Sequence, residues 1–254
     1  MVRDELLARI EAAVIPPPLD LTVPADEHDR AMWRRFITIY DALLDLLRIQ
    51  GFFAGQTLLI PGSGVDAFPA RVVPTIGIER ELLADAALNL AARVTGRGRD
   101  VYAVHFTMNP GNAIDPRCYP NVQTPHRTVL FKGMMGYLMQ GEQARLEAYL
   151  DDLQGVMRAG DRIIICNRAD LEASAGWLAE HGWQRRDDWL PAAEQARLDA
   201  ALERLRTDPD NVRERHLLNT HRTFFEIPEV LVVYEWVPAT PTTDAVSDES
   251  ADEE

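Results

Sequence analysis

Residues 57–81 read TLLIPGSGVDAFPARVVPTIGIERE, and this stretch decides the fold. An apolar run, Thr57–Ile60, leads directly into the glycine-containing residues 61–64, and a second run, Thr75–Ile78, ends at Glu79. Glycines at the carboxyl end of a strand let the backbone turn sharply and approach a ligand without a Cβ in the way. In open α/β sheets, ligands bind outside the carboxyl ends of the strands. The stretch therefore predicts two neighbouring strands that share a ligand cleft.

The rest of the chain alternates short apolar runs with helical stretches. Further strands are predicted at 101–106, 128–131, 162–166 and 230–236, and helices between them at 80–94, 142–157 and 170–181. Near-continuous apolar strands separated by helices are typical of a parallel sheet that is covered on both faces. The predicted fold class is therefore α/β, a three-layer, doubly wound, mostly parallel sheet of about seven strands.

The chain divides into three predicted parts. Residues 1–56 form an N-terminal helical extension or cap, in which residues 29–49 carry apolar side chains at helical spacing. Residues 57–237 form the α/β domain, with a helical insertion near 191–222, and the acidic tail 238–254 has too little to bury to be ordered. The extension could cover the cleft on the substrate side, pack as a homodimer interface, or simply cover the core.

Composition limits the classes of partner. The 254 residues are 46% hydrophobic and carry a formal net charge of −14, which disfavours binding to the phosphate backbone of a nucleic acid. The two cysteines, Cys118 and Cys166, and the scattered histidines lack metal-ligand spacing, so we expect no metal. Without a long apolar run or a signal-like N-terminus, the chain is expected to be cytoplasmic and not to bind membranes.

Charge distinguishes between the nucleosides that such a cleft could bind. The carboxylate of Glu79 could accept hydrogen bonds from both hydroxyls of a ribose. The dinucleotide fingerprint G-x-G-x-x-G would have its third glycine at Ala67, and Asp66 would place a carboxylate beside the pyrophosphate. A cationic sulfonium ligand tolerates that carboxylate. S-adenosyl-L-methionine is therefore favoured, and an NAD(P)-dependent oxidoreductase is the alternative.

Several segments between Thr57 and Trp236 resemble the class I S-adenosylmethionine-dependent methyltransferases. Residues 60–64 resemble the glycine-rich first motif of that superfamily, and residues 77–79 its second-strand acid. Residues 128–137 are similar to the fourth strand and its loop, residues 153–166 to the helix, turn and fifth strand, and residues 230–236 to the antiparallel seventh strand. The resemblance implies methyl transfer to a small-molecule or peptide acceptor. A short first crossover and an irregular loop at 108–126 depart from it, so a catalytically inactive binding module is a further alternative.

The same resemblance implies a set of site residues. In-line methyl transfer mainly requires that the nucleophile and the methyl group be held about 3–3.5 Å apart. A general base is needed only when the acceptor must lose a proton. The candidates for catalysis are Lys132, Tyr137 and His105. The predicted cofactor-binding residues are Pro61, Gly62, Ser63, Gly64, Asp66, Glu79, Arg80, Thr107, Lys132 and Gly133.

Overall fold

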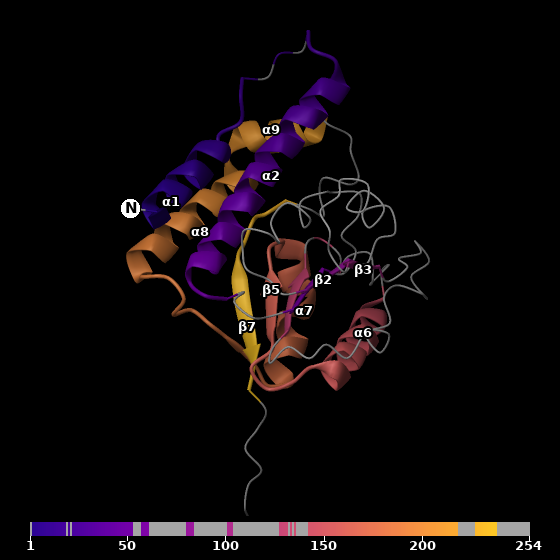
Figure 1. Ribbon diagram of the computed structural model, residues 1–254. Helices are drawn as coiled ribbons and strands as arrows, with labels where there is room; N and C mark the ends of the chain where they lie inside the picture. The colour runs from indigo at the N-terminus through magenta and orange to yellow at the C-terminus, as the bar shows by residue number, and fades with distance from the viewer. Residues whose placement is uncertain are drawn as a thin grey trace, which may run out of the picture.

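A computed structural model gives the architecture of the chain. It describes residues 2–18, 20, 22–52, 57–60, 80–83, 101–103, 127–131, 133, 135, 142–217 and 227–237. In these residues, helices pack on a twisted sheet, and each face of the sheet has its own hydrophobic cluster (Figure 1).

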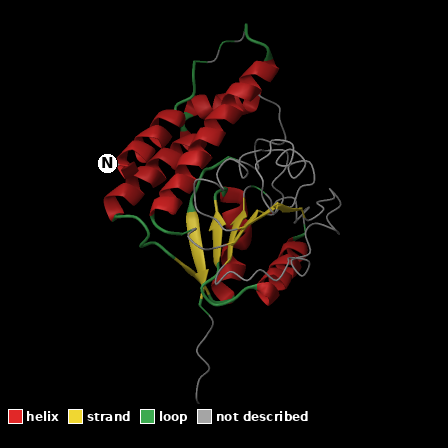
Figure 2. Cartoon of the chain, viewed as in Figure 1, coloured by secondary structure: helices red, strands yellow, loops and turns green. Residues whose placement is uncertain are grey.

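The strands form one mixed sheet (Figure 2). Its strands are β1 (Thr57–Ile60), β2 (Arg80–Leu83), β3 (Val101–Ala103), β4 (Arg127–Phe131), β5 (Arg162–Ile165), β6 (Trp183–Arg185) and β7 (Val232–Trp236). They lie in the order β3-β2-β1-β4-β5-β7-β6. The first five strands run parallel to one another, and β7 runs antiparallel to both β5 and β6. The predicted combination of parallel strands with an antiparallel last strand is confirmed.

Alternation along the central strands divides their side chains between two hydrophobic clusters. Leu130 of β4 and Ile164 of β5 belong to one cluster, and their neighbours Val129 and Ile163 belong to the other. All four side chains are fully buried. This is the pattern of strands covered on both faces, where successive side chains point to opposite sides of the sheet.

One face of the sheet is covered by α6 (Gln143–Val156) and α7 (Arg168–Glu180). Leu146, Leu150 and Leu153 of α6 pack with Leu178 of α7 against this face. Both helices lie within a residue or two of their predicted bounds, because their apolar residues recur at helical spacing.

A second helical layer lies on the opposite face. It contains α1 (Val2–Ala13), α2 (Ala25–Ile49), α8 (Ala192–Thr207) and α9 (Pro209–Leu217). In this layer α1 packs against both α2 and α8, and α9 packs against α8, so the two ends of the chain build the layer together (Figure 1). Leu43 and Leu47 of α2 are fully buried with Leu198 and Leu202 of α8 in the same cluster as the sheet face.

The long helix α2 differs from its prediction at one end. It begins at Ala25, directly after Pro24, and not at Asp29. Proline is favoured at a helix start because it has no amide hydrogen to leave unpaired. The helix ends before Gly51, where a φ of +79° suits glycine.

Other differences concern short or polar elements. The strand β6 is not predicted as an element, because a three-residue strand gives almost no periodic signal, whereas α9 lies within the predicted helical insertion near 191–222. The loop 108–126 and the tail 238–254 lie outside the described residues.

Candidate functional site

The strand order predicts a ligand crevice at the carboxyl ends of β1 and β4. The chain passes from β1 to β2 on one side of β1, and later returns to form β4 on the other side. The two strands are parallel and in register, with Leu59 opposite Val129, so their carboxyl ends lie side by side. Ligands in open α/β sheets bind at this kind of switch in strand order.

The glycine-rich segment follows β1 directly at this edge. Ile60 is the last residue of the strand, and Pro61, Gly62, Ser63 and Gly64 come next in the sequence. These four residues and Asp66 lie outside the described residues, so their binding roles remain predictions. Also outside are Thr107 and His105, which follow β3 in the sequence, as well as Lys132 and Tyr137, which follow β4.

The second strand is not where the sequence predicts it. The prediction of a helix from residue 80 is wrong at its start, since β2 occupies Arg80–Leu83, and the expected strand at 75–78 lies outside the described residues. Arg80 pairs with Thr57, which puts it at the amino end of the strands and not beside the crevice. Two short apolar runs lie close together here, and periodicity cannot choose between them.

This shift changes which acid follows the second strand. Glu79 lies outside the described residues and precedes β2 in the sequence, so it does not follow the strand as predicted. Because Ile60 pairs with Leu83, the residues after Leu83 begin at the same edge as the glycine-rich segment. The first carboxylate after Leu83 in the sequence is Asp85. The role of Glu79 as a ribose ligand remains a prediction.

The turn after β4 is fixed from a neighbouring helix. Gly133, a predicted cofactor-binding residue, has a φ of +74°, a backbone conformation that favours glycine. Its backbone N–H donates to Oδ2 of Asp170 at 2.7 Å, and the N–H of Met135 donates to Oδ1 at 2.9 Å. The turn next to the crevice is therefore held by a side chain of α7.

The start of α7 explains why Asp170 reaches this turn. Asn167 follows β5 and caps the helix, accepting hydrogen bonds from the N–H groups of Ala169 and Asp170 at 2.9 and 3.3 Å. Asp170 thus lies in the first helical turn, where the aligned peptide dipoles favour a carboxylate. It is only 1% exposed. The sequence analysis missed this residue, although Asn-x-x-Asp after a strand is a recognisable cap signal.

The helical layer of α1, α2, α8 and α9 extends to the same edge. Its cluster includes Cys166 at the end of β5, and Ile227 and Leu231 before β7. Asn167 also donates through Nδ2 to the carbonyl of Ile227 at 3.2 Å. The layer therefore reaches the edge of the sheet where β5 ends, and the role of the N-terminal extension as a cap over the cleft remains a prediction.

A second buried carboxylate holds the opposite edge of the same strands. Asp161 accepts hydrogen bonds from the backbone N–H groups of Arg127 at 2.7 Å and Arg158 at 2.8 Å. The Arg127 guanidinium lies 3.3 Å from Asp161, and burial lowers the pKa of Arg127. Like Asp170, Asp161 is a buried carboxylate that accepts two backbone N–H groups, but it lies at the amino ends of β4 and β5.

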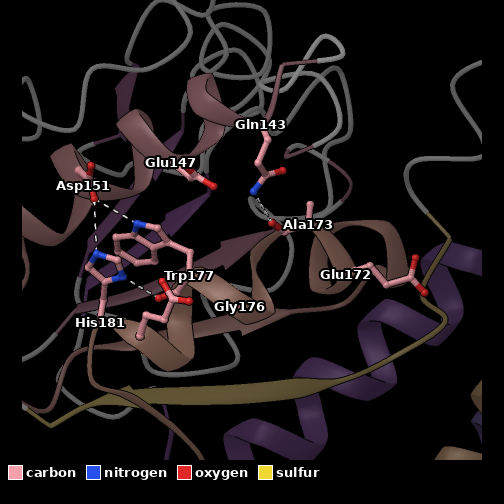
Figure 3. Close-up of a pocket in the computed structure, with 9 residues that line it drawn as sticks. Gln143, Glu147, Asp151, Glu172, Ala173, Gly176, Trp177 and His181 are labelled. Atoms are coloured by element: carbon pink, nitrogen blue, oxygen red, sulfur yellow. Dashed lines mark hydrogen bonds and ion pairs between the residues drawn. The ribbon is translucent and has the colours of Figure 1, made fainter.

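A hollow of about 450 Å³ lies between α6 and α7. Figure 3 shows the indole of Trp177 stacked on the imidazole of His181, with ring centres 4.0 Å apart. Trp177 Nε1 donates to Asp151 at 3.0 Å. Residues of α6 and α7 line the hollow and no strand contributes to it, so it is separate from the crevice at the sheet edge.

The described part of the chain contains neither a cluster of metal-ligating side chains nor a membrane-spanning helix. No three His, Cys, Asp or Glu side chains are grouped there to hold a metal ion. None of the described helices has the length and apolar character needed to cross a membrane.

Comparison with known proteins gives distant structural likenesses only. Neither a family model nor a curated protein matches the chain. Among solved structures, the chain is similar to the [4+2]-cyclase SpnF, with a TM-score of 0.44 and 12% identity over 92% of this chain and 93% of that one.

Two further matches are methyltransferases with bound S-adenosylhomocysteine. They are the N-methyltransferase NodS of Bradyrhizobium japonicum WM9 (TM-score 0.40, 14% identity, 73% of this chain and 88% of that one) and an enzyme of Geobacter sulfurreducens (0.38, 15%, 92% and 98%). At these low scores and identities, the likenesses assign no function to this chain.

Proposed function

We propose that this chain is an S-adenosylmethionine-dependent methyltransferase that acts on a small-molecule or peptide acceptor by in-line methyl transfer. One observation carries the proposal: β1, which the glycine-rich residues 61–64 directly follow in the sequence, ends at the switch in strand order next to β4 and the fixed turn after it. The resemblance of the sequence to class I methyltransferases, including its antiparallel last strand, supports the same assignment.

The chemistry of this edge fits a cationic cofactor. Asp170 places a buried carboxylate at the turn after β4, and Asp66 adds a second acid to the glycine-rich segment of the sequence. Negative charge disfavours the pyrophosphate of a dinucleotide and favours a ligand that carries sulfonium and ammonium groups. The antiparallel β7 between β5 and β6 also departs from the strand order 3-2-1-4-5-6 of dinucleotide-binding sheets.

The residues of the chain would act mainly by orientation. S-adenosylmethionine, when bound, supplies a methyl group that its sulfonium already activates. The protein then has to hold the acceptor in line with that group, with the α1, α2, α8 and α9 layer as one wall. Lys132, the residue directly after β4, is our first candidate for removing a proton from the acceptor, and Tyr137 and His105 are the others.

The acid that binds the ribose can be identified with a matched pair of variants. We expect D85A to weaken binding of S-adenosylhomocysteine by more than about tenfold and E79A to change it by less than about twofold, because Asp85 follows the described β2 and Glu79 precedes it. The reverse result would support Glu79, as the sequence analysis predicts.

Isothermal titration of the wild-type chain tests the function itself. S-adenosylhomocysteine is expected to bind with micromolar affinity, while NADH and NADPH do not bind. Transfer of a labelled methyl group from the cofactor to acceptors in a small-molecule and peptide extract would then test activity. Binding of NADH without S-adenosylhomocysteine would favour the oxidoreductase, and cofactor binding without transfer would favour the inactive module.

A further inference from the structure

Asp170 and the neighbouring strand β5 fix the chain on both sides of Lys132. Before Lys132, the carbonyl of Phe131 accepts a hydrogen bond from the N–H of Cys166 at 3.2 Å. After it, the N–H of Gly133 donates to Oδ2 of Asp170 at 2.7 Å. The backbone that leads into and out of Lys132 is thus held by residues of the β5–α7 connection.

The second oxygen of Asp170 extends this hold. Oδ1 accepts the N–H of Met135 at 2.9 Å, so the carboxylate spans residues 133–135 with both oxygens. Hydrogen bonds to a charged acceptor are about twice as strong as neutral ones, and burial of Asp170 keeps water from replacing them. The N–H groups of Gly133 and Met135 are therefore directed toward α7.

We propose that Asp170 is a positioning residue for the cofactor, which sets the backbone at Gly133 and Met135, next to the predicted crevice; this inference rests on the proposed function. Asp170 would act through the backbone of the turn and not by touching the acceptor. The ligand class it serves is the cationic adenosyl cofactor, because the same buried charge adds negative potential at this edge.

The variant D170N tests this role with little change in shape. An asparagine side chain offers one oxygen and one NH₂ group, so it can accept only one of the two N–H groups and presents a donor to the other. We expect binding of S-adenosylhomocysteine to weaken by about tenfold or more. Hydrogen exchange, followed by mass spectrometry, is expected to quicken in peptides that cover residues 133–135.

The chain provides a matched control in D161N. Asp161 is equally buried and also accepts two backbone N–H groups, from Arg127 at the start of β4 and from Arg158 in the turn before β5, but at the opposite edge. D161N additionally leaves the Arg127 guanidinium without its charged partner, so it is expected to destabilise the fold at least as much as D170N does. Its affinity for S-adenosylhomocysteine should nevertheless remain within about twofold of wild type.

A second variant covers the case in which D170N does not fold. N167A removes the cap that orients Asp170 but keeps its charge, and a smaller loss of affinity is expected. Equal losses in D170N and D161N, or wild-type affinity in folded D170N, would overturn the positioning role. Failure of the wild-type chain to bind would refute the proposed function and this inference with it, whereas unchanged exchange at 133–135 would refute the inference alone.

Discussion

The variant R35A tests whether the two ends of the chain form a single helical layer. Arg35 of α2 donates through Nη1 to Glu214 of α9 at 2.7 Å and through Nη2 to Asn211 at 2.8 Å, and its Nε donates to the carbonyl of Ala13 at 3.2 Å. The side chains of Arg35 and Glu214 are 12% and 7% exposed. One guanidinium thus ties α1, α2 and α9 together in a nearly dry environment.

The magnitude follows from what R35A leaves behind. The Glu214 carboxylate stays in its buried position without the guanidinium, and removal of one partner from a buried ion pair costs about 3–5 kcal/mol. We expect the free energy of unfolding to fall by that amount. Urea denaturation followed by circular dichroism, with tryptophan fluorescence as a second probe, measures the change and shows whether the layer unfolds separately from the sheet.

Two further variants separate buried charge from packing. R35L/E214L replaces both partners with apolar side chains, and it should recover part of the stability lost in R35A because no unpaired charge remains. R197A removes an ion pair between α1 and α8 of the same layer, where Arg197 contacts Asp4 and Glu11 in solvent, and should have little effect. A loss below about 1 kcal/mol in R35A would refute this account of the layer.

Three smaller predictions concern single positions. G51A should lower the free energy of unfolding by about 1 kcal/mol, because φ is +79° there while no atom lies within 4 Å of the added Cβ. G176A, in the exposed middle of α7, should raise it by up to about 1 kcal/mol, since its Cβ also meets open space and alanine favours a helix; urea denaturation measures both. The hydrogen bond from Arg197 lowers the pKa of Asp4 in the folded chain. The stability that this pair contributes is therefore present above pH 3.8, the ordinary pKa of the carboxyl group, and is lost as the pH falls through the lower folded pKa. Thermal unfolding from pH 6 to 2.5 should show a smaller loss of stability in acid for R197A than for the wild type.

The sequence predicts the elements with strong patterns and misses those that depend on distant contacts. The buried strands β4 and β5 and the helices α2, α6, α7 and α8 follow from apolar runs and helical spacing. The bounds of β2 do not, because its apolar residues are as few as those of the run before it. A three-residue strand such as β6 needs its partner β7 to become visible.

The candidate site also has parts that can be predicted from local sequence and parts that depend on distant contacts. The position of residues 61–64 after β1 is readable from the sequence, since a strand and a glycine turn are local features. The role of Asp170 is not readable, because its hydrogen bonds reach residues 35 and 37 positions earlier in the chain. An acid in the first turn of a helix is common on electrostatic grounds alone, so its type and spacing do not reveal that partner.

The helical layer has a consequence for how this protein is made. The apolar stripe of α2 leaves the ribosome early, but its partners in α8 and α9 are synthesised much later; Arg35 and Glu214 are 179 residues apart. Until then, the apolar surface of α2 that α1 does not cover lacks its native partners, and partly made chains are expected to need a chaperone or to associate with one another. Arrest of translation before residue 192 should therefore give nascent chains that aggregate, whereas chains extended past residue 217 should remain in solution.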